Sequence, residues 1–497
     1  MAIPKVCGIE TEYGIQVMHG DPNPIAASSV LINAYAHDVA RQQTGWDFED
    51  EAPGNDARGF AREGAMPPQV ETHLVNTVLT NGARFYVDHA HPEFSTPECR
   101  DALECLRYDR AGELILTRAM EAADLAVHDG SRVVIYKNNS DGKGNSYGAH
   151  ENYLMDRAAP FTRIVAGITP HFVTRQIFAG AGKVGAETAT HDGRRVDFQL
   201  SQRAEFFEEQ VGLETTLKRP IVNTRDEPHA DPQRYRRLHV IVGDANLAEV
   251  ATFLKVGTTS LVLAMIEDDV SGSRNLALAD PVRAIHEVAL DRTFTSALPM
   301  ADGSTATALG IQWELFSLAR KYADDRGLEC MGDEGIGEEV LKRWESVLHG
   351  LETDPMSLAR QLDWVAKLQL IEAYRDRHHC DWDDHRLAAL DLQYHDLRPA
   401  RSLFARLDTE RLIDEAAVAT AVSEPPRSTR AWFRGQCLKK WPSSVVTANW
   451  DSLVFDLGAD PLRRVPMMDP LKGTAEHVED LLNVCASPSE LLDRLSS

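Results

Sequence analysis

The order in which two kinds of segment follow each other along the chain is the feature that most constrains its fold. The first 245 residues contain short extended stretches that end in polar clusters, whereas from about Asn246 the apolar residues recur at near-helical spacing. This helical pattern covers residues 247–263 and returns over residues 358–374. Strands early and helices late predict an α+β fold rather than alternating βαβ units.

The length and the composition describe a globular protein with one large domain and an appendage. The chain has 497 residues, of which 43% are hydrophobic, and this is enough for a sizeable buried core. The tract SEPPRST at residues 423–429 is the best candidate linker, because consecutive prolines end helices and favour extended backbone. We therefore predict a catalytic domain over residues 1–425 and a small C-terminal domain over residues 426–497.

The formal net charge of −24 limits the partners of the chain. Nucleic acids and anionic membranes both reward positive protein surface, so we expect neither as a partner. No secretory signal pattern is present, and the most apolar later stretch, residues 256–266, contains polar residues and is too short to span a bilayer. Seven scattered cysteines, none in a CxxC pair, are typical of reduced thiols. These features predict a cytoplasmic location.

Residues 46–80 form a long stretch that is rich in Glu, Asp, Pro and Gly and lacks sustained periodicity. Loops of that length inside a compact domain are usually functional or disordered. We predict a mobile inserted loop here.

Two early segments alternate so that acidic residues share one face. In residues 5–17, read as one strand, Glu10 and Glu12 point the same way, with Cα atoms roughly 6.5–7 Å apart. In residues 82–96, Arg84, Tyr86 and Asp88 share a face, and the HPE sequence that follows would leave the strand and place Glu93 near its end. Carboxylates presented in this way could hold Mg²⁺ shared with nucleotide phosphates. The alternative is that these are solvent faces of edge strands.

Other strand-like segments also have one polar face. They offer His150 with Asn152, Gln199 and Ser201 with Arg203, the lone His239, and, in a loop, Arg225. A lone His beside an apolar strand is more often a satisfied core residue than a ligand. Several polar strand faces in one domain nevertheless indicate the lining of a cavity, where Arg225 would suit phosphate or carboxylate.

Six motifs together resemble the Pup ligase and Pup deamidase/depupylase family of actinobacteria. They are GIETEYG at residues 8–14, NGARFYVDHAHPE at 81–93, YKNN at 136–139, GAHENY at 148–153, NTRDEPHAD at 223–231 and RAWFRG at 430–435. Members of this family look like the carboxylate-amine ligases related to glutamine synthetase. The resemblance implies a curved, mainly antiparallel sheet backed by helices, with a small C-terminal domain.

The resemblance also implies cofactors and roles for individual residues. ATP, or ADP with phosphate, would bind on the concave sheet together with Mg²⁺, and Asp88 would be catalytic. The implied metal ligands are Glu10, Tyr86, Glu93, His150 and His239. The implied cofactor-binding residues are Glu12, Arg84, Thr96, Arg203, Arg225, Arg434 and Trp450. Of these, Arg203, Arg225 and Arg434 could equally contact substrate carboxylates.

Within the family, two features favour the hydrolase over the ligase. The stretch over residues 46–80 and the residues His89 to His91 are similar to those of the deamidase/depupylase branch. The predicted reaction is ATP-dependent hydrolysis at the γ-carbonyl of the last residue of Pup, which deamidates a C-terminal Gln or cleaves the bond to a target lysine. Asp88 would attack the carbonyl or act as base on a water. The alternatives are a Pup–protein ligase and a nucleotide-binding regulator without turnover.

The implied partners are Pup, pupylated proteins and, as a further candidate, the proteasomal ATPase. Members of this family act on a Pup that is acidic and largely disordered, so its docking on so acidic a chain requires a locally basic groove. We predict that Lys218, Arg234, Arg236 and Arg237 form this groove. The alternative is that these basic runs belong to a solvated charged face.

Overall fold

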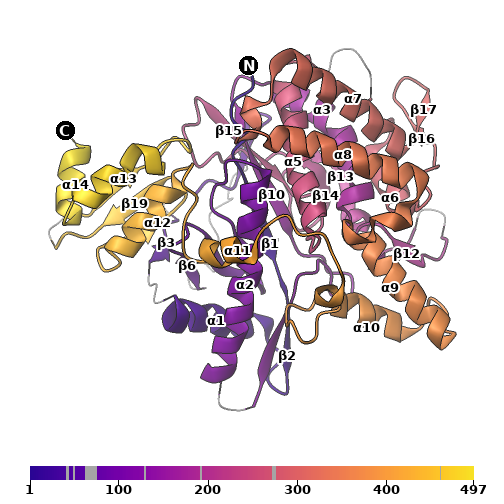
Figure 1. Ribbon diagram of the computed structural model, residues 1–497, viewed down its shortest axis with the longest axis horizontal. Helices are drawn as coiled ribbons and strands as arrows, with labels where there is room; N and C mark the ends of the chain where they lie inside the picture. The colour runs from indigo at the N-terminus through magenta and orange to yellow at the C-terminus, as the bar shows by residue number, and fades with distance from the viewer. Residues whose placement is uncertain are drawn as a thin grey trace.

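The computed structural model of the chain describes residues 1–40, 44–48, 51–61, 75–127, 130–190, 193–270, 276–458 and 461–496. A ten-stranded sheet runs through the molecule (Figure 1). Its strands, in spatial order, are β15 (Tyr235–Val240), β10 (Ala149–Asp156), β1 (Cys7–Glu12), β8 (His91–Ser95), β7 (Arg84–Asp88), β6 (Asn76–Val78), β3 (Gly45–Trp46), β18 (Val445–Ala448), β19 (Ser452–Phe455) and β20 (Arg463–Pro466). All neighbouring strands are antiparallel except β3 and β18, which run parallel.

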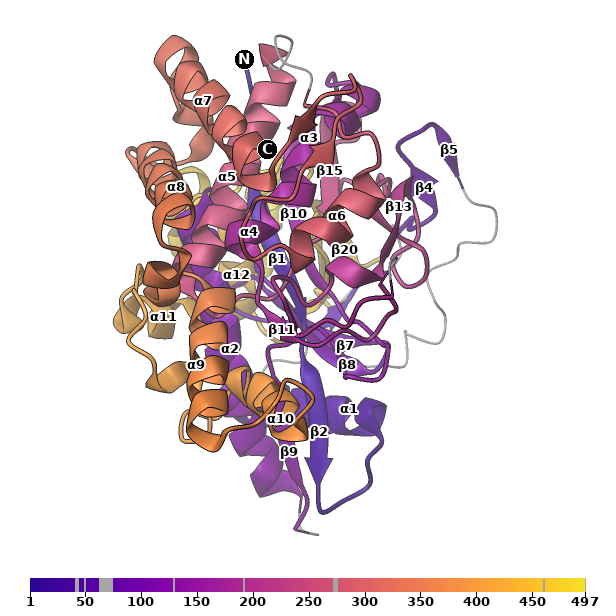
Figure 2. The ribbon, with the colours of Figure 1, turned by 90° about the vertical axis from the view of Figure 1, so that its right-hand side faces the viewer.

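Helices cover one side of the sheet and form the rest of the main body (Figures 1 and 2). They are α1 (Pro24–Ala34), α2 (Ala102–Ala126), α3 (Phe161–Thr174), α4 (Gln176–Ala179), α5 (Glu249–Glu267), α6 (Pro281–Leu290), α7 (Ala308–Arg326), α8 (Ile336–Thr353), α9 (Asp363–His378), α10 (His385–Tyr394) and α11 (Glu415–Ala421). Three more, α12 (Ala431–Lys440), α13 (Ala475–Val484) and α14 (Pro488–Leu495), pack beside β18 to β20. The predicted α+β fold with a mainly antiparallel sheet backed by helices is confirmed.

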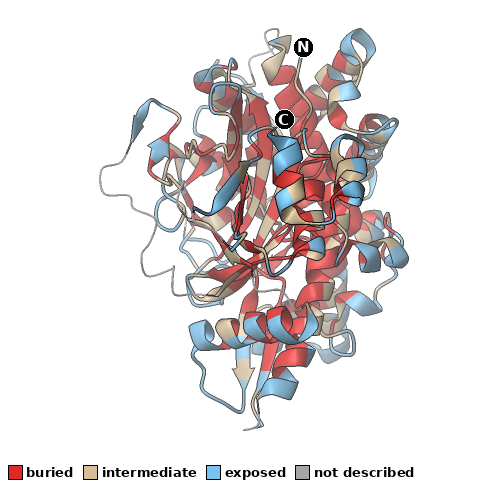
Figure 3. Cartoon of the chain, turned by 90° about the vertical axis from the view of Figure 1, so that its left-hand side faces the viewer, coloured by how far each residue is buried: buried red, intermediate tan, exposed pale blue. Residues whose placement is uncertain are grey.

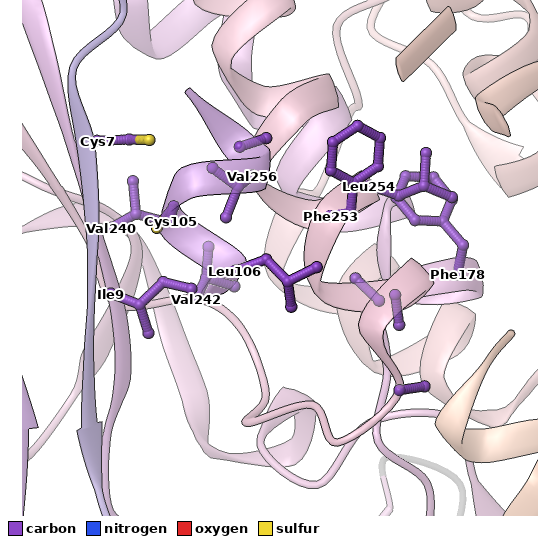
Figure 4. Close-up of a cluster of buried hydrophobic side chains, with 14 of the residues drawn as sticks. Cys7, Ile9, Cys105, Leu106, Phe178, Val240, Val242, Phe253, Leu254 and Val256 are labelled. Atoms are coloured by element: carbon purple, nitrogen blue, oxygen red, sulfur yellow. The ribbon is translucent and has the colours of Figure 1, made fainter. Parts of the chain in front are cut away.

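The alternation of β1 separates the core from the polar face. Cys7 and Ile9 are buried and pack with Leu106 of α2 and with α5, as Figure 4 shows. Glu10 and Glu12 therefore point away from this core, because successive side chains of a strand face opposite sides. The core against which β1 packs thus fixes the direction of both carboxylates.

The apolar helix α5 is a core helix. Its sequence is long and apolar enough to cross a membrane, but the whole apolar window is buried against other elements, and it is the one such helix among the described residues. Figure 3 shows buried residues concentrated in the sheet and the helices behind it, with exposed residues on the outer helices and turns. Burial inside the protein accounts for the composition of α5 without a membrane.

Two predictions about the early strands were wrong in detail. The segment 5–17 is two strands: β1 ends at Glu12, and β2 (Gly14–Met18) pairs with β9 (Arg132–Tyr136) in a separate sheet. A Cβ on Gly14 would lie 2.3 Å from the side-chain oxygen of Asn138, so a glycine permits this close passage. Residues 82–96 form a hairpin, and Glu93 lies within β8 opposite Tyr86 rather than beyond a strand end.

The prediction that helices come late was incomplete, because α1, α2, α3 and α4 all lie within the first 245 residues. The sequence did carry a signal for α2. Asp101 caps the helix by accepting hydrogen bonds from the backbone N–H groups of Leu103 and Glu104, and acidic caps before an apolar periodic segment mark helix starts.

The C-terminal unit is joined closely to the main body. The tract at 423–429 is packed rather than open, with both prolines and Thr429 buried. The hydrophobic cluster of this unit includes Trp46 and Val78 from the N-terminal half, and β3 joins the two parts of the sheet. The division at residue 425 stays a prediction.

The predicted mobile loop over residues 46–80 lies partly outside the described residues, at 49–50 and 62–74. The described parts form β3, β6 and a small hairpin of β4 (Asn55–Asp56) and β5 (Phe60–Ala61) that projects beside β13 (Phe207–Gly212), as Figure 2 shows. This hairpin is held to the main body by a hydrogen bond of 2.7 Å from the Thr224 hydroxyl to Asp56.

Candidate active site

A cavity of about 360 Å³ lies on the polar face of the sheet. Its size is within the range of ordinary ligand sites. Nine of the residues predicted for the site line it: Glu10, Arg84, Tyr86, Asp88, Glu93, His150, Arg225, His239 and Trp450. The part of the chain predicted as an inserted loop also contributes to its wall, through Phe48, Glu51, Pro53 and Gly54.

Strand register brings these side chains together. On one side of β1, Glu10 lies opposite His150 of β10; on the other side, Glu12 lies opposite Glu93 of β8. Glu93 is also opposite Tyr86 of β7. Directly opposed residues of an antiparallel pair have neighbouring side chains on one face. The sheet therefore presents a row of acidic and imidazole groups across four adjacent strands.

Glu10, His150 and His239 form one group that could hold a metal ion, with one ligand atom of each within 4.8 Å of the others. Burial alone would raise the pKa of Glu10, but the contact with His150, whose Nδ1 atom lies 3.7 Å from the carboxylate, and the nearby Arg237 outweigh burial and hold this pKa well below its usual range. Burial, together with Arg237, keeps the pKa of His239 well below its usual range, so its imidazole is neutral at pH 7. An ionised carboxylate and a neutral imidazole are the protonation states that metal ligation requires.

Glu12, Asp88 and Glu93 form a second group, which contains only oxygen ligands within the same mutual distance of 4.8 Å. Glu93 is buried, and burial with the charges of Asp88 and Glu12 raises its pKa well above the usual range. Three carboxylates in so small a volume require a proton or a cation. Hard oxygen ligands suit Mg²⁺, so this donor set fits the predicted metal.

Tyr86 stands apart from both groups in its chemistry. Burial and the charge of Glu93 raise the pKa of its phenol well above the usual range, so the hydroxyl is neutral at pH 7. The Ser95 hydroxyl donates to the Tyr86 hydroxyl oxygen at 3.5 Å. The role of Tyr86 as a metal ligand stays a prediction.

Asp88 lies at the end of β7 and faces the cavity. Burial opposes its ionisation, but the hydrogen bond with His89 and the nearby His150 and Arg84 outweigh burial and lower the pKa of this carboxyl. The Nδ1 atom of His89 lies 3.1 Å from the Asp88 carboxylate, and His89 has a positive φ of 50° at the hairpin turn. At neutral pH Asp88 is therefore an ionised carboxylate at the edge of the acidic groups.

Arginine side chains line the cavity together with the carboxylates. The Arg84 guanidinium lies between the rings of Trp46 and Tyr86, 4.0 Å and 3.8 Å from their centroids, and donates to the Asn76 side chain at 2.9 Å. The buried Nε atom of Arg225 has no hydrogen-bond partner among the residues that the structure describes. A buried unpaired donor costs free energy, so Arg225 suits an anionic ligand such as phosphate.

Two predicted arginines do not line the cavity. Arg203 is buried and donates to the backbone carbonyls of Ile241 and Gly243, and Arg434 is buried against Glu98. Thr96 lies in an adjoining pocket of about 80 Å³, where its hydroxyl accepts from the backbone N–H of Ile9 at 3.0 Å. This pocket shares Trp450 with the cavity.

The predicted basic groove does not form as one surface. Arg236 and Arg237 are successive residues of β15 and face opposite sides: Arg236 is buried and donates to the Ala159 carbonyl, while Arg237 lines the cavity beside Glu10. Arg234 pairs with Asp469 at the surface, at 3.0 Å. The prediction of a common groove was wrong because it ignored the alternation of a strand.

Sequence reasoning missed Arg237, His229 and Glu227 as cavity residues. The signal for Arg237 was available, since it lies two residues before His239 on the same strand and so shares its face. His229 and Glu227 follow Arg225 in a loop, where no periodicity indicates which side chains point inward.

The model of the Pup-ligase protein family matches residues 5–454 of the chain. The chain belongs to the Pup ligase family. The depupylase of Acidothermus cellulolyticus is 53% identical to it over 506 residues, covering 99% of each chain. The Pup deamidase/depupylase of Mycolicibacterium smegmatis is 47% identical over 510 residues, covering 99% of this chain and 100% of the relative.

Solved structures of the Pup ligase family have the same fold. The crystal structure of the complex between the prokaryotic ubiquitin-like protein Pup and its ligase PafA has a TM-score of 0.81 and 33% identity, covering 99% of this chain and 94% of that one. The structure of PafA in complex with ADP has a TM-score of 0.74 and 37% identity, covering 82% of this chain and 89% of that one. The predicted family and fold are confirmed, and the relatives described as depupylases are more similar to this chain than these two ligases.

Proposed function

We propose that this chain is a Pup deamidase/depupylase, an enzyme that hydrolyses the amide at the γ-carbonyl of the last residue of Pup. When that residue is Gln, ammonia leaves and Glu remains; when it is joined to a target lysine, the lysine amine leaves. One observation carries the proposal: a full-length match at 53% identity to a depupylase, with the acidic groups and Asp88 gathered in one cavity.

A nucleotide is the cofactor that the cavity fits. ADP is bound in the structure of a related ligase, and here Arg84, Arg225 and Arg237 offer guanidinium groups in a cavity of about 360 Å³. Guanidinium groups form charge-assisted hydrogen bonds with phosphates. We propose that ATP, or ADP with phosphate, binds here, with its base beside Trp450 and Thr96.

The two groups of candidate metal ligands described above fit divalent metal ions. Glu12 and Glu93 offer only oxygen atoms and suit Mg²⁺, while Glu10, His150 and His239 offer one carboxylate and two imidazoles. When bound there, such an ion would neutralise the carboxylates, hold the phosphates and withdraw charge from the amide carbonyl.

Asp88 performs the chemical step in this proposal. Its lowered pKa keeps it ionised at neutral pH, as either role requires. As a nucleophile, its oxygen bonds to the carbon of the side-chain carbonyl, the C–N bond breaks, the departing amine takes a proton, and water then hydrolyses the mixed anhydride. As a base, it takes a proton from the attacking water instead. Both routes consume one water and release one amine.

The test is a product assay on Pup that ends in Gln. We expect the wild-type protein, with ATP and Mg²⁺, to release one ammonia per Pup and to free a target protein from a Pup conjugate. Joining Pup that ends in Glu to a target lysine without ammonia release would instead identify the chain as a ligase. Pup and pupylated proteins are the substrates in this proposal; a contact with the proteasomal ATPase stays a prediction.

A further inference from the structure

A partly buried carboxylate, which lines the adjoining pocket, joins the main sheet to the C-terminal unit. Glu98, in the turn after β8, contacts two arginines of the α12 region. Its carboxylate accepts from the Arg430 Nε atom at 2.7 Å and makes a two-point contact with Arg434. The side chains of these arginines are 3% and 0% exposed, so Glu98 neutralises two guanidinium groups that water scarcely reaches.

Arg434 also holds two backbone carbonyls, one just before β7 and the other belonging to Trp450 of the cavity wall. It donates to the Gly82 carbonyl at 2.9 Å, just before β7, and to the Trp450 carbonyl at 3.0 Å. Its guanidinium carbon lies 5.1 Å from the centroid of the Trp450 ring. Because Glu98 fixes the Arg434 fork at two points, the positions of both carbonyls depend on this pair.

Trp450 lies where the cavity and the adjoining pocket meet, since it lines both. Its ring packs edge-on against Trp46 at 5.2 Å, and Trp46 in turn stacks on Arg84. A displaced Trp450 would therefore change the wall of the cavity. It would also disturb the packing of Trp46, on which the Arg84 guanidinium stacks.

We propose that the ion pair of Glu98 and the buried Arg434 positions Trp450 and thereby sets the affinity of the cavity for nucleotide. This rests on the nucleotide site of the proposed function and gives Arg434 a positioning role in place of the predicted contact with phosphate. The ionisation of Glu98 agrees with it: burial opposes the charge, but Arg434 and Arg430 outweigh burial and lower the pKa of this carboxyl to about 2.

The experiment measures the binding of ADP with Mg²⁺ by calorimetry, well below the unfolding temperature of each variant. The variants are Glu98→Gln, Trp450→Ala and their combination. The matched control is Glu479→Gln, which breaks an exposed ion pair of 2.7 Å with Arg427 in the same unit, and neither residue lines the cavity or the adjoining pocket. A double variant, Glu98→Gln with Arg434→Met, removes the charge of Arg434 along with that of its partner, so it keeps the test open if Glu98→Gln alone fails to fold.

We expect Glu98→Gln alone, and Glu98→Gln combined with Arg434→Met, each to raise the ADP dissociation constant about tenfold. The dissociation constant of the control, Glu479→Gln, should not change. On its own, Trp450→Ala should weaken ADP binding. Added to Glu98→Gln, it should weaken ADP binding further by less than about twofold, because the effects of coupled residues are not additive. In turnover, KM for the nucleotide should rise while kcat at saturation stays the same. A purely structural role would lower thermal stability and leave the ADP affinity as it is.

Two results would overturn the inference. One is an ADP affinity within about twofold of the wild type in both Glu98→Gln and Glu98→Gln with Arg434→Met. The other is that Glu98→Gln and Trp450→Ala change the ADP dissociation constant independently, so that the combined change is the product of the two single changes. ADP binding is measured without Pup, so a wild type that releases no ammonia would refute the proposed hydrolase and still leave this coupling measurable. A wild type that does not bind ADP would refute both.

Discussion

Glu12 and Glu93 are direct cross-strand partners of β1 and β8, and both point toward the cavity side of the sheet. Like charges directly opposite each other destabilise an antiparallel pair. Here Asp88 is near as well, and burial with these neighbours raises the pKa of Glu93 well above its usual range. The strand register thus concentrates three carboxylates in a small volume on one side of the sheet.

The first prediction concerns metal binding. At neutral pH without divalent ions, Glu93→Gln should be more stable than the wild type, because the ionised carboxylate is disfavoured in the folded state. Mg²⁺ at about 100 times its dissociation constant should stabilise the wild type by ~2.7 kcal/mol and the variant much less. Thermal unfolding with EDTA and with Mg²⁺ measures both effects.

The pH dependence of that difference has a definite sign. The pKa of Glu93 is raised in the folded state, so the destabilisation is absent below the unfolded pKa of 4.5 and grows as the pH rises above it. The metal-free variant should therefore gain its advantage only above this pH. Equal stability of the wild type and Glu93→Gln at pH 7 without divalent ions would contradict the raised pKa of Glu93 in the folded protein.

The second prediction concerns Asp88. Asp88→Asn should lower kcat for ammonia release by about 10³-fold or more, because the amide is neither a nucleophile nor a base. ADP affinity should change little, since the cationic groups remain. Asp302→Asn, in an exposed turn, is the control. Turnover of Asp88→Asn near the wild-type rate would assign the chemistry to another residue.

Strand alternation predicted much of the site. Period two placed Arg84, Tyr86 and Asp88 on one face, and Glu10 on the same face as Glu12, as the structure has them. The pairing of these strands, with Glu93 within a hairpin, could not be predicted because register depends on contacts between distant parts of the chain.

The arginines show where such reasoning fails. Arg434 and Glu98 are 336 residues apart in the sequence, and nothing local indicates that they pair. Arg203 likewise binds carbonyls of the segment that follows β15. A buried Arg can serve a ligand or the backbone with the same hydrogen bonds, and only the three-dimensional arrangement of the acceptors separates these roles.

The third prediction concerns Arg84. Arg84→Lys keeps the positive charge but loses the planar group that lies between Trp46 and Tyr86. Arg stacks on aromatic rings in a way that Lys does not, so ADP affinity should fall about tenfold, the equivalent of ~1.4 kcal/mol. Calorimetry with ADP and Mg²⁺ measures this. Arg283→Lys, on the exposed side of α6, provides the matched control, and an unchanged affinity in Arg84→Lys would show that charge alone is sufficient.

The fourth prediction concerns the pH dependence of Glu98. Its pKa falls from 4.5 to about 2 in the folded protein, so its contribution to stability is present above pH 4.5 and is lost as the pH falls toward 2. A shift of that size corresponds to at most on the order of 3 kcal/mol. The difference in free energy of unfolding between wild type and Glu98→Gln should therefore be largest at pH 5–7 and shrink at pH 4 and 3. Urea unfolding at each pH measures it, and Glu479→Gln, whose ion pair is exposed, should show a much smaller change. A difference that stays constant down to pH 3 would mean that Glu98 stabilises the fold by packing and not by its charge.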